Sequence, residues 1–154
     1  MRILRYRGGY KYQCVGDFHF QTAIYGLEIR TQFIRLSKTG LLTIVDGYAC
    51  DGPSGPTIDT PIFIYAAFVH DALYQLTRMG ELPFLNWRKC DYELKRAVLL
   101  KLKELRDEST RWEKFKSDVH EKAWKARLIW IMRGLKKADG RAADPRRLKE
   151  IYAI

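Results

Sequence analysis

The chain has 154 residues, of which 47% are hydrophobic and 13% aromatic. It is therefore long enough to bury a core and too apolar for an intrinsically disordered protein. Its net charge of +10 favours anionic partners such as nucleic acid, phospholipid headgroups or an acidic protein surface. The longest apolar run, residues 62–69, is shorter than the roughly 18 residues of a membrane span, and the basic start lacks a signal peptide's apolar core. We therefore expect one soluble domain, without a transmembrane segment, that is made in the cytoplasm.

The cysteines and the basic residues exclude several classes of site. Cys14, Cys50 and Cys90 are odd in number and widely spaced, which predicts free, buried thiols and neither a disulfide framework nor a zinc site. Basic residues dominate the first dozen positions and the tail, 135–154. No nucleic-acid-binding motif accompanies them, so sequence-specific binding of DNA or RNA is not expected.

The first third of the chain is typical of β-strands. Residues 10–14 and 18–22 carry aromatic and β-branched side chains in partial alternation. Residues 33–36 and 41–45 flank a turn with Gly40, which predicts a hairpin. The strand-rich segment 1–48 is followed by a Gly/Pro loop, 49–60, whose two prolines and two glycines end regular structure.

The segment 61–134 is predicted to hold about three helices. Thr60 and Pro61 suit the N-cap and the first helical position, so a helix should run to about Met79, with Gly80 as its C-cap. Asn86 is a candidate N-cap of the second helix. That helix has a core stripe with one charge among its members: Asp91, Leu94, Val98, Leu102 and Leu105.

A second set of apolar positions indicates a third helix, with Gly134 at its end. These positions are Trp112, Phe115, Val119, Ala126 and Trp130. The basic tail, 135–154, is loosely patterned and suggests one short helix after Pro145. Together the elements predict a single α+β domain over residues 1–154, in which a small N-terminal antiparallel sheet packs against about three helices.

The most informative pattern is an adjacent His70 and Asp71 at the end of the apolar run, because ionisable groups are costly to bury without partners. If the first two helices pack antiparallel, His70 and Asp91 can meet. The aspartate would fix the imidazole tautomer and leave the other nitrogen free as a general base toward water. Tyr74, one turn after His70, could brace the pair by a hydrogen bond.

Asp71 points about 100° away from His70 on a helix and could face the loop at 51–59. Loop glycines allow backbone carbonyls to converge on a hard cation such as Ca²⁺. A structural interpretation stays open beside this one. The His–Asp pair can simply lock two helices together, and the loop can be a rigid turn without a ligand.

Two resemblances add to these interpretations. Residues 47–60 (GYACDGPSGPTIDT), residues 69–75 (VHDALYQ), Arg88 and Asp91 closely resemble, in order and spacing, a family of tailed bacteriophages and prophages. It is catalogued as domain of unknown function 1353, and the resemblance covers most of residues 10–134. It implies a phage-encoded protein made in the cytoplasm of a bacterial host, but it implies no activity.

Residues 48–100 are also similar to the core of phospholipase A2. The disulfides of the secreted enzymes are absent, however, the loop holds prolines and an extra acid, Asp51, and the strand-rich N-terminal third has no counterpart in that enzyme. This similarity implies that His70, Asp91 and Tyr74 form the catalytic group. It also implies that calcium binds Asp71 together with residues of the loop: Cys50, Asp51, Gly52 and Ser54.

Two functions from different classes follow. The first is a calcium-dependent hydrolase of esters, acting on phospholipid, with the basic termini held at anionic headgroups. The second is a non-enzymatic phage protein, associated with the virion or tail or acting as an accessory factor. In the second case the His–Asp group is structural, and the basic arms bind a phage or host protein.

Overall fold

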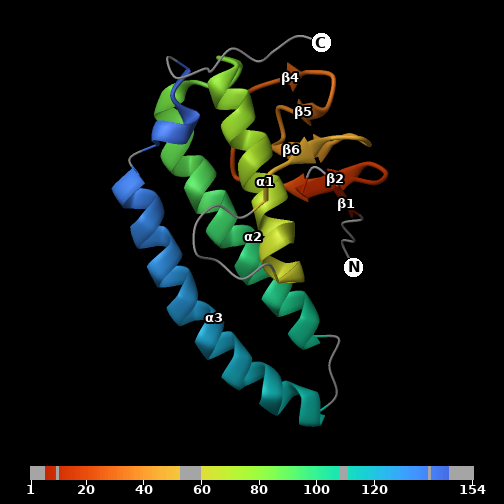
Figure 1. The fold of residues 1–154 in the computed structure, drawn as a ribbon, viewed down its shortest axis with the longest axis vertical. Helices are drawn as coiled ribbons and strands as arrows, with labels where there is room; N and C mark the ends of the chain where they lie inside the picture. The colour runs from red at the N-terminus through yellow and green to blue at the C-terminus, as the bar shows by residue number, and fades with distance from the viewer. Residues whose placement is uncertain (1–5, 10, 53–59, 108–110, 139, 146–154) are drawn as a thin grey trace.

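The computed structural model describes residues 6–9, 11–52, 60–107, 111–138 and 140–145. Two small antiparallel sheets come first and three helices follow, so the predicted α+β class is confirmed. In Figure 1 α1 and α2 lie side by side at the centre, the strands lie against α1, and α3 runs along the opposite side of α2. Helix α1 is thereby enclosed between the strands and α2.

The strands form two sheets, where the sequence predicted one. The first sheet has the order β1-β2-β7 and consists of β1 (Tyr6–Gly9), β2 (Lys11–Cys14) and β7 (Ala49–Cys50). The second has the order β3-β6-β5-β4 and consists of β3 (Phe18–Gln21), β4 (Ile29–Arg30), β5 (Ile34–Leu36) and β6 (Leu41–Ile44). Strand β7 lies beyond the predicted strand-rich segment, and its pairing with β2 holds the start of the Gly/Pro loop beside Tyr12.

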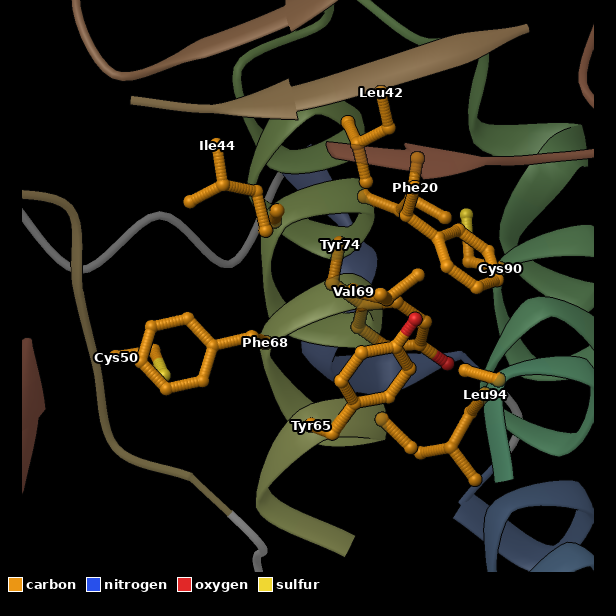
Figure 2. Close-up of a cluster of buried hydrophobic side chains, with 14 of the residues drawn as sticks. Phe20, Leu42, Ile44, Cys50, Tyr65, Phe68, Val69, Tyr74, Cys90 and Leu94 are labelled. Carbon is orange, nitrogen blue, oxygen red and sulfur yellow. The ribbon is translucent and has the colours of Figure 1, made fainter. Parts of the chain in front are cut away.

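The predicted hairpin is β5–β6, and its turn requires glycine. Gly40 has a φ of 81°, and a Cβ there would lie 2.9 Å from the carbonyl oxygens of Thr22 and Ile24. Alternate residues of β3, β5 and β6 face inward and bury Phe20, Ile34 and Leu42 completely. Figure 2 shows Phe20, Leu42 and Ile44 of the second sheet beside α1, with Leu94 of α2 on the other side of the cluster.

Helix α1 (Pro61–Arg78) begins and ends as predicted. The Thr60 side chain accepts a hydrogen bond from the Phe63 N–H, and Pro61 occupies the first turn. Residues 62–70 are all buried, because α1 is covered on several sides. Helix α2 (Trp87–Asp107) follows a 3₁₀ turn, η1 (Phe84–Asn86), and begins directly after Asn86.

Helix α3 (Arg111–Ala138) differs from its prediction in two ways. It continues past Gly134, since one exposed glycine costs only about 1 kcal/mol in a long helix, and the chain turns at Gly140 with a φ of 66° before the 3₁₀ turn η2 (Arg141–Ala143). Ala126 and Trp130 are exposed, and among the described side chains of α3, 121–138, those that face the core are Trp124, Leu128 and Ile131. The side chains of Trp112, Phe115 and Val119 lie outside the described part. The predicted short helix after Pro145 lies outside the described residues.

Candidate functional site

The pairing of α1 with α2 brings His70 and Asp91 into direct contact. Nε2 of His70 lies 2.9 Å from Oδ1 of Asp91, and the Tyr74 hydroxyl donates to the same oxygen at 2.7 Å. The spacing of His70 and Tyr74 along α1 stacks their rings at 4.1 Å between centroids. The contact expected from the sequence is therefore present, while its role in catalysis stays a prediction.

The second ring nitrogen of His70 is the open position of this group. Nδ1 lies 3.6 Å from Oδ1 of Asp71, which is longer than a direct hydrogen bond. The side chain of Asp71 is 26% exposed, against 11% for His70 and 6% for Asp91. The Nδ1 side of the buried ring therefore lies beside the more exposed carboxylate, and the Nε2 side lies beside the more buried one.

The charges around His70 determine its protonation. Burial of the ring lowers the pKa of His70, but the neighbouring carboxylates of Asp71 and Asp91 more than offset burial, and the pKa is raised above 6.5. Burial and the hydrogen bond to Asp91 raise the pKa of Tyr74 above 10, so its hydroxyl stays a donor at neutral pH. The aspartate thus receives two donors and favours the imidazolium form.

Asp71 lies near Cys50 at the start of the Gly/Pro loop, while most of the segment that it was expected to face, 53–59, lies outside the described residues. Burial, followed by the charge of Asp71, raises the pKa of Cys50 to about 12. This thiol is accordingly no nucleophile at neutral pH. Gly52 has a φ of 69°, and a Cβ there would lie 2.6 Å from the Tyr12 ring, so only glycine fits this turn.

The other predicted metal ligands with an oxygen in the side chain are Asp51 and Ser54. Asp51 is exposed, and Ser54 lies outside the described residues. Among the residues that the structure describes, no group of three or more histidine, cysteine or acidic side chains is arranged to hold a metal ion. Asp71 is therefore the one predicted carboxylate that the structure places beside both His70 and the loop.

Glu93 is a buried carboxylate that the sequence analysis missed. It is 1% exposed; Oε1 accepts from the Ala23 N–H at 2.8 Å and Oε2 accepts from Nε of Arg96 at 2.9 Å. Arg96 also donates to the Gln21 carbonyl, so this pair ties α2 to the second sheet. The sequence signal for this burial is the position of Glu93 between Cys90 and Ala97, two small residues on the same face of α2.

The three cysteines are free and buried, as expected. Comparison of the chain with protein-family models, with curated proteins and with solved structures found no match. The resemblances to the phage family and to phospholipase A2 therefore stay predictions, and the functional argument depends on the geometry around His70.

Proposed function

We propose that the protein is a phage-encoded, calcium-dependent hydrolase of phospholipid esters, with His70 as general base. The observation that carries the proposal is the arrangement of the two ring nitrogens. Nε2 is bonded to the buried Asp91, while Nδ1 lies on the side of the more exposed Asp71, 3.6 Å from its Oδ1, too far for a direct hydrogen bond. This division is what a base needs, because one nitrogen is held and the other can take a proton from water.

In the proposed mechanism, a water molecule at Nδ1 loses its proton to His70 and attacks the ester carbonyl. Asp91 stabilises the imidazolium that forms, and Tyr74 holds the aspartate in place through its hydroxyl. The imidazolium then returns the proton to the leaving alkoxide. Because the pKa of His70 is raised, its neutral form grows only as the pH rises above 6.5, and hydrolysis should increase with pH in that range.

Among the described residues of the site, one side chain, that of Asp71, is suited to bind calcium. Asp71 is a partly exposed carboxylate whose nearest partner at the loop is a neutral thiol, so it can accept a cation. Further oxygens would come from backbone carbonyls of the Gly/Pro loop, beginning at Cys50 and Gly52. Bound there, calcium would supply positive charge for the ester carbonyl oxygen.

The test is release of fatty acid from phospholipid vesicles, detected by mass spectrometry, with calcium or with a chelator. We expect release by the wild type only with calcium, and a loss of about 10²-fold or more in Asp71→Asn. Asp107→Asn is the matched control, because Asp107 is exposed at the end of α2. Equal activity in calcium and chelator would remove the calcium mechanism while leaving His70 as a base.

A second candidate is the non-enzymatic one, a virion, tail or accessory protein made in the host cytoplasm. Its supporting observation is burial, since His70 and Asp91 are both buried and their bond joins α1 to α2. In that case Asp91→Asn lowers the free energy of unfolding by roughly 1–3 kcal/mol, and no variant has a catalytic phenotype. A folded wild type without hydrolytic activity that co-purifies with other proteins of the same phage would favour this candidate.

A further inference from the structure

The outward face of α3 carries two large apolar side chains. Ile129 is 56% exposed and Trp130 is 53% exposed. On the helix they lie opposite the stripe that packs toward the core, which consists of Trp124, Leu128 and Ile131. In Figure 1 this part of α3 is on the outer side of the molecule, and α2 covers only its inner side. An isoleucine and a tryptophan are therefore exposed side by side on the outward face of the helix.

Five cations share this face with the apolar pair, and all are exposed: Lys122, Lys125, Arg133, Lys136 and Lys137. At 100° per residue they fall within about 90° of the centre of the face, before and after Ile129 and Trp130 along the helix. Lys125 is paired with Glu121 at 2.6 Å. Within the described part of the chain, the other four form no ion pair.

This combination matches a surface that lies in a membrane interface. An aromatic side chain prefers the level of the headgroups, and lysine or arginine around it bind anionic lipids while their methylene stems cover apolar surface. The helix is too polar to cross a bilayer, and among the described residues no helix meets that requirement. The face would therefore lie flat on the membrane.

We propose that the α3 outer face, defined as Ile129, Trp130 and the five surrounding cations, binds the surface of an anionic phospholipid bilayer. Binding of nucleic acid would account for the cations, but it would not account for an exposed isoleucine beside the tryptophan. A second copy of the chain would bring two faces of equal positive charge together. The proposal uses no residue of the His70 site and stands whether or not the protein hydrolyses lipid.

The test is co-sedimentation of the full chain with vesicles of ether-linked phosphatidylglycerol, whose bonds an esterase cannot cut. We expect binding that weakens with added salt, and at least tenfold weaker binding in the double variant Ile129→Ala with Trp130→Ala. Replacing Arg133, Lys136 and Lys137 by Gln should weaken binding about fivefold for each charge removed. The control is the double variant Tyr25→Ala with Leu85→Ala, since these side chains are 64% and 88% exposed on other elements.

Several results would overturn the proposal. Binding to neutral phosphatidylcholine as tight as to phosphatidylglycerol would remove the role of the cations. Unchanged vesicle binding in the Ile129/Trp130 variant would remove the role of the apolar pair. A wild-type dimer in light scattering that becomes a monomer in that variant would assign the face to self-association. DNA binding that depends on both the cations and Trp130, without vesicle binding, would assign it to nucleic acid.

The variant His70→Asn should bind vesicles as the wild type does. A failure of hydrolysis is therefore separable from a failure of membrane binding.

Discussion

Asp91 and Glu93 are two buried carboxylates, two residues apart on α2, and they face different parts of the molecule. Glu93 faces the second sheet, and each of its oxygens has its own donor, Ala23 N–H or Arg96 Nε. Asp91 faces α1, and one of its oxygens takes both the His70 ring and the Tyr74 hydroxyl. The first group is a closed link between two elements, whereas the second includes a ring nitrogen that faces away from its aspartate.

The comparison distinguishes two kinds of buried carboxylate on one helix, one paired with an arginine and one paired with a histidine. Burial alone does not separate them, because both carboxylates are almost inaccessible. What separates them is the partner. An arginine stays charged at every accessible pH, while a histidine can exchange a proton near neutrality. We therefore expect substitutions at Glu93 to affect folding and substitutions around Asp91 to affect chemistry first.

The largest expected effect is on catalysis, in Asp91→Asn. Loss of the carboxylate removes the charge that stabilises the His70 imidazolium, so the rate of ester hydrolysis should fall by about 10²–10⁴-fold. The measurement is kcat on a soluble short-chain phospholipid, with thermal unfolding to show that the variant is folded. A folded variant with wild-type kcat would place Asp91 in the same structural class as Glu93.

The next effect is on stability, in Glu93→Gln. It leaves the Arg96 guanidinium without its carboxylate, and we expect the free energy of unfolding in urea to fall by about 3 kcal/mol. The specific activity of the folded fraction should be that of the wild type. A large loss of activity in a stable Glu93 variant would contradict the division between the two groups.

Tyr74→Phe should have a smaller effect on both quantities. It removes one of the two donors to Asp91 but keeps the ring beside His70, so about 1 kcal/mol of stability and less than tenfold in kcat should be lost. Urea unfolding and the same hydrolysis assay measure the two losses. If Tyr74→Phe were as inactive as Asp91→Asn, the hydroxyl would itself take part in the proton transfer.

The last prediction concerns pH and distinguishes His70 from Glu93. Because the folded-state pKa of His70 is raised above 6.5, the stability that its protonation contributes is fully present below about pH 6.5. It is lost as the pH rises through the raised pKa. The difference in unfolding free energy between the wild type and His70→Gln should therefore become smaller as the pH rises from 6. The difference between the wild type and Glu93→Gln should not show this decline. A stability difference at His70 that grows with pH would show that the carboxylates do not favour the imidazolium.

The sequence was sufficient for the bounds of α1, for the start of α2 and for the meeting of His70 with Asp91. Caps at Thr60 and Pro61 are local, and a short connection makes α1 and α2 antiparallel neighbours, so spacing alone brings the two side chains together. Division of the strands into two sheets depends on long-range pairings such as β2 with β7, which no local pattern shows. Glu93 was missed for a similar reason, since it accepts from the Ala23 N–H, 70 residues away, and its ion-pair partner Arg96 donates to the similarly distant Gln21 carbonyl. Trp130 was placed in the core on hydrophobicity, but α3 packs on one side only.

The most direct test of the central claim compares His70→Asn with His19→Asn in the hydrolysis assay with calcium. His19 is an exposed histidine on β3 that bonds to Thr43, so it controls for the chemical change without touching the site. The proposed mechanism predicts that His19→Asn keeps wild-type activity and that folded His70→Asn loses about 10²-fold or more. Equal activity in the two folded variants would contradict it, and His70 would then be a structural residue that joins α1 to α2.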